Sequence, residues 1–333
     1  MTPREIIAEA WSMTQRERKI RAWGFVSELL ETLLDTKLLV YQTYFAYTFM
    51  QGDPVGFFIV EETLMQILPT WGFITFITLL IILIILEIFI PKMCLGAIIG
   101  LAAKAHKKEE VRGGLVLALY NFLPLFAVRE FFVLGHITIV ITIGSLVLRY
   151  MPTGLHIPII FLVLVFWFLS NIFRLFAIFA EEDIVIRKSG IFGALGRSFK
   201  LIISHLSHVF FLFLLLLVIS LRILLNAIVL FVLPAIIIGL SVLLAFFLST
   251  ALTAIFTTIA AIILILFTSY FFAYVHVFTQ SVWTITYMEL QKMKDLDIIE
   301  VGEETLSTLP IESTSAEEEA GEIPQSEAVG QNP

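Results

Sequence analysis

The sequence predicts an all-α membrane protein, a polytopic transmembrane helix bundle of about six spans with interfacial amphipathic helices. The chain is 59% hydrophobic and only 15% charged, whereas soluble domains carry roughly 25% charged residues. Several apolar runs approach the ~20 residues that a helix needs to cross a bilayer. These runs are continuous rather than alternating, which favours helices over the strands of a membrane barrel.

Residues 1–36 form the first expected region, which is cytoplasmic and interfacial. Its start is polar and basic, and the pattern becomes amphipathic from Trp23. Glu28, Glu31 and Asp35 have the spacing i, i+3, i+7 and therefore share one helical face. This pattern predicts a helix that lies at the membrane interface or forms the polar foot of a first span.

Residues 37–292 form the expected transmembrane helical domain, in which proline, glycine and charged residues separate the apolar runs. Pro124 is expected to kink an entry segment that begins at Gly113. Whether residues 34–50 and 235–248 fully span the bilayer is left open. The expected spans are 34–50, 71–90 with a continuation past Pro91 to 103, 131–148, 157–180, 209–232 and 251–287.

A basic amphipathic helix is expected over Gly190–Leu206, between the fourth and fifth spans. Its apolar residues recur at helical spacing, namely Phe192, Leu195, Phe199, Ile202 and Leu206. Basic residues near this helix are candidate contacts for anionic lipid headgroups, because each contributes roughly 1 kcal/mol near such lipid. These candidates are Arg187, Lys188, Arg197 and Lys200.

Residues 293–333 are expected to form an acidic, disordered cytoplasmic tail. No Lys or Arg follows Lys294, and ten acidic residues follow from Leu296 onward. Low hydrophobicity with high net charge is typical of disordered chain, which cannot bury enough apolar surface to fold.

The basic residues predict the topology, because Lys and Arg in short loops mark the cytoplasmic side. Four clusters lie within 4–21, 104–112, 187–200 and 292–294, and they hold five, four, four and two of the 21 basic residues. All four are cytoplasmic if residues 34–50 cross the membrane and 235–248 do not. This arrangement gives six spans with both termini in the cytoplasm. The alternative topology reverses those two segments and places the second and third clusters outside.

Ionisable residues inside a membrane are costly, so each one is a candidate functional residue. Glu87, Arg222, Asn226 and His276 are the candidates for an intramembrane polar site, either an ion path or a headgroup pocket. A structural reading pairs Arg222 and Asn226 with Glu87 or Asn171 to hold the bundle together. No catalytic, metal-binding or nucleotide-binding motif stands out, and the single cysteine excludes an intramolecular disulfide. We therefore expect no enzyme activity and no cofactor.

Two short stretches resemble a bacterial membrane-protein family. One runs from Glu181-Glu182-Asp183 through Gly190 to Ala194-Leu195-Gly196-Arg197-Ser198, and the other is Ile285-Thr286-Tyr287-Met288-Glu289-Leu290. The family comprises stand-alone inner-membrane proteins and the membrane domain fused to some glycerophosphoryl diester phosphodiesterases. The resemblance implies a six-helix membrane domain. It does not carry over the enzyme activity, because the acidic tail cannot fold as the catalytic barrel.

The expected function is that of a non-enzymatic protein that organises lipid or a partner complex at the cytoplasmic membrane. Its expected partners are membrane lipids with anionic headgroups and a protein bound at the cytoplasmic face, with no nucleic acid. The alternative is a small-molecule or lipid transporter whose path Glu87, Arg222 and His276 would line. No internal repeat is visible, which weakens the case for an inverted-repeat transporter.

Overall fold

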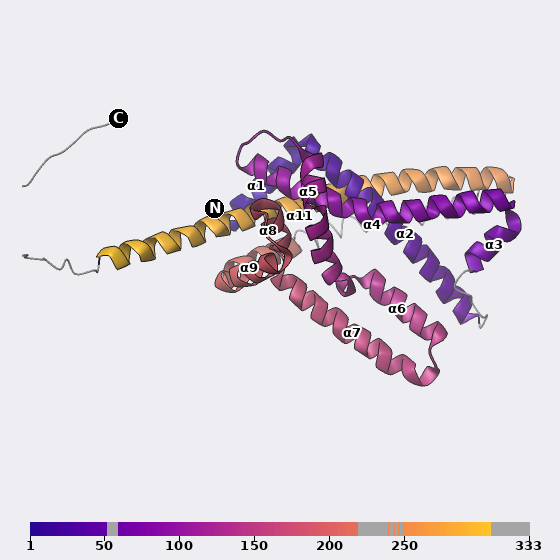
Figure 1. Ribbon diagram of the computed structural model, residues 1–333. Coiled ribbons are helices and arrows are strands. Elements are labelled where there is room, and N and C mark those ends of the chain that lie inside the picture. Colours follow the sequence, from indigo (N-terminus) through magenta and orange to yellow (C-terminus); the bar gives the residue numbers. More distant parts are fainter. Residues whose placement is uncertain (52–58, 219–238, 240–242, 244–245, 247–248, 308–333) are drawn as a thin grey trace, which may run out of the picture. The chain divides into compact units, whose positions relative to one another are not determined.

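The computed structural model describes residues 1–51, 59–218, 239, 243, 246 and 249–307. Every regular element in these ranges is a helix, which confirms the all-α class (Figure 1). Residues Met1–Gln291 form one compact unit, and Lys292–Pro333 form a second. The expected span at 209–232 and the segment 235–248, whose crossing was left open, lie largely outside the described residues.

Four helices in the described ranges are long and apolar enough to cross a membrane. They are α4 (Thr70–His106), α5 (Gly114–Phe131), α7 (Thr153–Phe176) and Ile255–Met293 of α11 (Thr250–Ser307). A fifth crossing results if α9 (Ile191–Ser204) and the helix Leu206–Val218, which meet at 93°, form one broken span. Few side chains in the most apolar stretches are buried within the protein, and α7 buries none. Such exposed apolar helices require a lipid environment, so the chain is a membrane protein.

The expected span 131–148 is wrong as a single helix. α5 ends at Phe131, a 3-10 turn follows over Val133–Gly135, and α6 (Ile137–Tyr150) then begins. His136 between them is extended, with φ −82° and ψ 128°. Asn171 of α7 donates a hydrogen bond of 3.2 Å to the carbonyl oxygen of Gly135, which satisfies a backbone group exposed by the break. The segment from Gly113, which was expected only to lead into this span, is helix α5 and has the length and composition of a span itself.

α2 (Arg18–Met50) runs antiparallel to α4. Lys37 of α2 contacts Glu87 of α4, while Lys19, near the start of α2, donates to the carbonyl oxygen of Val111 beyond the end of α4. α4 is continuous through Pro91 to His106, as the sequence predicted. At 1.5 Å per residue, this helix of 37 residues is roughly 55 Å long, well beyond the ~30 Å hydrocarbon thickness. The short helix α3 (Ile59–Ile67) precedes it.

The last part of α4 is buried in protein rather than exposed to lipid. Its residues from Cys94 to Ala103 pack in two neighbouring clusters of buried side chains. The larger cluster joins α4 to α1 (Pro3–Arg16), to α9 and to the part of α11 between Val277 and Leu290. His106 lies 2.8 Å from Glu9 of α1 and 3.4 Å from Glu289 of α11. The end of α4 therefore contacts α1 and α11, which brings the first two basic clusters close together.

The N-terminal residues form more helix than the sequence analysis expected. α1 buries Ile6, Ala10 and Met13, which share one face. Thr2 and Glu5 form a capping box, in which the threonine hydroxyl accepts from the amide of Glu5 and the glutamate accepts from the amide of Thr2. This pattern, Thr followed three residues later by Glu, is a sequence signature of a helix start.

α9 confirms the expected helix. Ile202 of the expected apolar stripe is buried, whereas Phe192 and Phe199 are exposed, and Ala194 and Ser198 complete the buried face. Small residues allow helices to approach closely in membrane proteins. The hydroxyl of Ser198 accepts from the amide of Phe179 at 3.1 Å and donates to the carbonyl oxygen of Phe176 at 2.8 Å. The exposed side chains of Phe192 and Phe199 are available to contact lipid.

The carboxylate of Asp183 in α8 (Ala180–Arg187) joins three helices. Arg197 of α9 donates to it through Nε and Nη2 at 3.0 and 2.8 Å. Tyr287 of α11 donates its hydroxyl at 2.5 Å, and the Ser189 hydroxyl donates as well. Burial alone would raise the pKa of Asp183, but these hydrogen bonds outweigh it and lower the pKa below its ordinary value of 3.8. The bonds therefore stabilise the fold above pH 3.8, and this stabilisation is lost as the pH falls through the lowered pKa.

The acidic tail begins as helix in the described residues. α11 continues to Ser307, beyond the point at which disordered chain was expected. The segment after Gln291 contains Leu, Met, Lys and Glu, all good helix formers, which accounts for this difference. The expected disorder of residues 308–333 falls outside the described residues.

Replacing Asp183 by Asn is expected to lower the free energy of unfolding by about 2–3 kcal/mol, because Arg197 then loses the charge of its buried partner. The change is measured as a lower midpoint of thermal unfolding in detergent. Glu17→Gln is the matched control, since the pair of Glu17 with Arg16 is exposed and is worth at most ~1 kcal/mol. Equal losses in the two variants would contradict a central role for Asp183.

Candidate functional site

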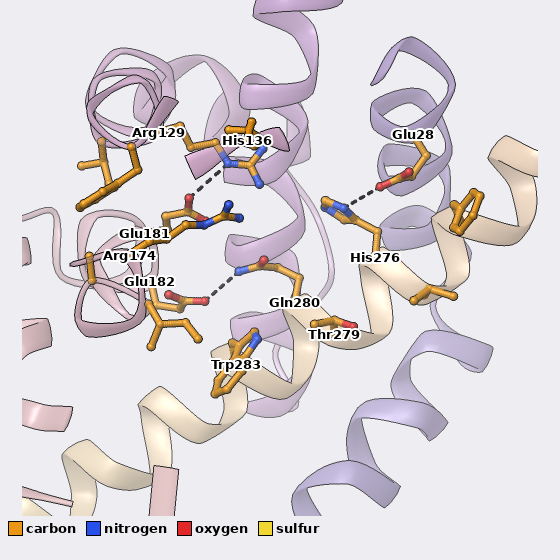
Figure 2. Close-up of a pocket in the computed structure, with 16 residues that line it drawn as sticks. Glu28, Arg129, His136, Arg174, Glu181, Glu182, His276, Thr279, Gln280 and Trp283 are labelled. Carbon is orange, nitrogen blue, oxygen red and sulfur yellow. Dashed lines mark hydrogen bonds and ion pairs between the residues drawn. The ribbon is translucent and has the colours of Figure 1, made fainter. Parts of the chain in front are cut away.

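A cavity of about 360 Å³ lies where α2, α5, α7, α8 and α11 meet. Figure 2 shows its charged and polar side chains gathered around one space. This size is within the range of small-molecule sites. The lining includes Glu28, Arg129, His136, Arg174, Glu181, Glu182, His276, Thr279 and Gln280, together with apolar residues such as Phe132, Phe272 and Trp283.

Arg129, in the last turn of α5, joins two other helices at the cavity. Its guanidinium lies 3.2 Å from Glu181 of α8 and 3.4 Å from Glu31 of α2. Both carboxylates come from elements that are distant in sequence, so the arginine holds α2, α5 and α8 around the cavity. Arg129 therefore both ties these helices together and lines the cavity.

Arg174 is a cation without a partner at the same cavity. It lies in the last turn of α7 and makes no hydrogen bond or ion pair within the described ranges. Glu181 and Glu31 attract it only at longer range. A guanidinium offers five N–H donors in a planar fork that matches a phosphate or carboxylate. Arg174 is consequently the side chain most available to bind an anion here.

Glu182 is buried, with only 1% of its surface exposed. Its Oε1 accepts a hydrogen bond of 2.7 Å from the amide of Gln280, whereas Oε2 has no partner. Burial raises the pKa of Glu182 well above its ordinary value of 4.5, and the charge of Glu181 adds to this rise. Hydrogen bonds from its own backbone and from Gln280 oppose the shift but do not cancel it. The protonated form of Glu182 therefore persists to higher pH than that of an exposed glutamate.

Glu28 and His276 form the opposite part of the lining. His276 Nδ1 lies 2.8 Å from Glu28 Oε1. Gly24, one helical turn before Glu28, permits this contact, because a β-carbon there would clash with Val277 of α11. The close approach of α2 and α11 thus sets the distance between Glu28 and His276.

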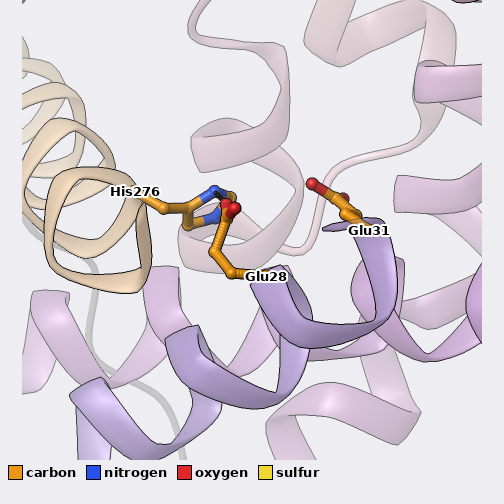
Figure 3. A group of neighbouring side chains, drawn as sticks. All are labelled: Glu28, Glu31 and His276. Carbon is orange, nitrogen blue, oxygen red and sulfur yellow. Dashed lines mark ion pairs between the residues drawn. The ribbon is translucent and has the colours of Figure 1, made fainter. Parts of the chain in front are cut away.

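Glu28, Glu31 and His276 are also the donor set that could hold a divalent cation (Figure 3). One potential ligand atom from each lies within 4.8 Å of the other two. However, His276 already contacts Glu28, and Arg129 already pairs with Glu31. A cation would have to displace both contacts beside a fixed guanidinium, so this group is better suited to ion pairing.

The four predicted intramembrane residues do not all meet at this cavity. His276 lines it, but Glu87 does not. Glu87 is buried beside Lys37, with 2.5 Å between Oε2 and Nζ. Arg222 and Asn226 lie outside the described residues, and so does their expected pairing with Glu87. Among the described residues, Glu87 and His276 belong to two separate ionic contacts.

The predicted headgroup contacts are also divided. Arg197 is occupied by Asp183, and Lys188 donates to Asn121 at 3.1 Å while lying 4.6 Å from the centre of the Tyr120 ring. Arg187 and Lys200 are exposed. Within the described ranges, these two are the members of the group that have no hydrogen bond or ion pair.

The sequence analysis did not single out Arg129, Arg174, Glu182 or Gln280 as site residues. The sequence did contain one relevant pattern, because Arg129 and Arg174 each lie near the end of an apolar run. Their meeting with Glu181 and Glu182 depends on contacts between distant helices. No family model, no curated protein and no solved structure matches this chain.

Glu182→Gln is expected to raise the midpoint of thermal unfolding at pH 8 by a few degrees and to change it little at pH 5. A carboxyl group with a raised pKa is stabilising below its unfolded pKa of about 4.5, and that stabilisation is lost as the pH rises through the folded pKa. Glutamine retains the acceptor for Gln280 and cannot ionise. The measurement is thermal unfolding in detergent across this pH range, with Glu110→Gln on the exposed surface as control. A gain that is equal at both pH values would contradict the assignment.

Proposed function

We propose that this protein binds the phosphate of a membrane lipid at the cavity and so organises lipid at the cytoplasmic membrane without catalysis. The observation that carries the proposal is the guanidinium of Arg174, which lines the cavity and lacks a partner among the described residues. Arginine pairs with phosphate through two parallel hydrogen bonds, and such charge-assisted bonds are about twice as strong as neutral ones.

The surroundings of Arg174 favour a lipid as the source of the phosphate. α7 exposes its apolar side chains along its whole length, and Arg174 stands in its last turn. Long basic side chains near helix ends reach the headgroup region of the bilayer. The cavity also has apolar lining at Phe132, Phe272 and Trp283, against which the carbon atoms of a lipid could pack.

The contacts of the end of α4 with α1 and α11 support a cytoplasmic location for both termini. The Glu9, His106 and Glu289 contacts bring the start of the chain, the second basic cluster and α11 together. Basic clusters on one side mark the cytoplasm. We extend the proposal to the exposed Arg187 and Lys200, as further contacts for anionic headgroups or for a protein partner at this face. Membership in the family that the sequence resembles remains part of the proposal.

Transport is the second candidate function. The observation that favours it is a cavity lined by both cations and carboxylates, since intramembrane ionisable groups commonly mark ion or substrate paths. His276 with Glu28 supplies a titratable pair at this cavity. Flux of a bound lipid or solute across a reconstituted membrane would distinguish transport from retention alone.

Arg174→Gln is expected to reduce phospholipid that copurifies with the protein by about tenfold, because it removes the charged hydrogen bonds to phosphate. Native mass spectrometry of the protein released from nanodiscs measures this retention. Arg4→Gln is the matched control, since it removes one exposed positive charge at a residue that does not line the cavity. Equal retention by wild type and Arg174→Gln would refute the proposed lipid site.

The topology gives a separate prediction. A protease added outside intact cells should leave the acidic tail after Lys294 intact, whereas the same protease should remove it after the cells are permeabilised. A terminal epitope read by immunoblot measures the cleavage. Trimming in intact cells would overturn the cytoplasmic placement of the C-terminus.

A further inference from the structure

We infer that the bound phosphate carries a primary amine, so that the ligand class is the aminophospholipid headgroup or a soluble compound with the same phosphate–amine chemistry. This inference rests on the proposed function and specifies its ligand. The observation behind it is that the unpaired guanidinium of Arg174 and a group of acceptors, Glu28, Thr279 and Gln280, lie on different sides of the cavity, while Glu181 and Glu182 lie beside the arginines.

The donor side consists of Arg129 and Arg174, on α5 and α7. The acceptor side consists of Glu28 on α2 with Thr279 and Gln280 on α11. Figure 2 shows Glu28 with His276 across the cavity from the two arginines, and Gln280 between these groups. A ligand that matches both sides needs an anionic end and a cationic, hydrogen-bond-donating end.

The acceptor side has unused capacity. Gln280 donates its amide N–H to Glu182, which leaves its side-chain oxygen as an acceptor. Neither that oxygen nor the Thr279 hydroxyl has a hydrogen-bond partner in the described part of the chain, and neither is a buried unsatisfied atom. Glu28 uses one oxygen toward His276, and a carboxylate has about four acceptor positions.

A primary ammonium group fits this set better than other headgroup ends. It carries one positive charge and three N–H donors, so it can serve Glu28, Thr279 and Gln280 together. A quaternary ammonium has the charge but no N–H donor. The hydroxyls of a glycerol headgroup can donate but would leave the carboxylate of Glu28 without a compensating charge.

The charges of the cavity also favour a zwitterion. Arg129 is already paired with Glu181 and Glu31. Among the described residues this leaves the guanidinium of Arg174 without an ion pair, with the carboxylate of Glu28 across the cavity from it. A ligand with opposite charges at its two ends can contact both groups, whereas a purely anionic ligand matches only Arg174.

The test uses the full chain in nanodiscs made of equal parts phosphatidylethanolamine, phosphatidylcholine and phosphatidylglycerol with identical acyl chains. Native mass spectrometry then identifies the retained lipid. Wild type is expected to retain the ethanolamine lipid about tenfold over the other two, because charged hydrogen bonds to the amine are lost with either competitor. Glu28→Gln should abolish this preference while total phospholipid retention stays within about twofold.

Thr279→Val is a second variant that removes one acceptor at nearly constant shape, and it should reduce the preference without abolishing it. Glu110→Gln, on the exposed surface, is the control and should leave the preference unchanged. If Glu28→Gln fails to fold, Thr279→Val alone still tests the acceptor side. Retained lipid with no headgroup preference, or a preference unaffected by both cavity variants, overturns this inference and leaves the proposed lipid site standing.

Soluble compounds separate the two sources of the same chemistry. In detergent free of lipid, phosphoethanolamine should raise the midpoint of thermal unfolding, whereas glycerol phosphate should raise it less. This shift together with no retained lipid supports a soluble phosphate–amine ligand and refutes the lipid proposal. No retained lipid and no shift with either compound refutes both.

Discussion

The rest of the structure depends on the carboxylate of Asp183. Its hydrogen bonds with Arg197 and Tyr287 tie α8 to α9 and α11. The side chain itself is buried. Because adjacent residues on a helix point about 100° apart, fixing Asp183 also directs Glu181 and Glu182 elsewhere, toward Arg129 and Gln280. One buried anion thus orients two further carboxyl groups into the cavity.

Two environments divide the helices of the first unit. The apolar stretches of α4, α7 and α11 expose large side chains, because lipid replaces water there and the hydrophobic effect does not drive helices together. Burial is instead concentrated where α1, the end of α4, α9 and the later part of α11 meet. The cavity lies beside this buried region, at the ends of α5 and α7. Its charges can therefore reach the polar headgroup zone while its aromatic lining continues the apolar surface.

Pairing of charges explains why so many ionisable residues are tolerated in such an apolar chain. Lys37 neutralises Glu87, Arg129 neutralises Glu181 and Glu31, and His276 contacts Glu28. A buried charge without such a partner is costly. Arg174 is exposed instead, so water or a ligand can contact its guanidinium. Glu182 is buried, and its raised pKa lowers the same cost by favouring the protonated form.

The sequence by itself determined the class of the protein, the long apolar helices, the continuation of α4 past Pro91 and the helix over 191–204, because length and hydrophobic periodicity are local properties. It also contained the capping box at Thr2, although the pattern was not recognised. Only the tertiary structure decided the break at His136, the inward face of α9 and the partner of Glu87. These features depend on contacts between residues far apart in the chain, such as Asn171 with Gly135 and Lys37 with Glu87. Arg129 and Arg174 became parts of one site for the same reason, since a shared cavity exists only after α5 and α7 pack beside α8 and α11.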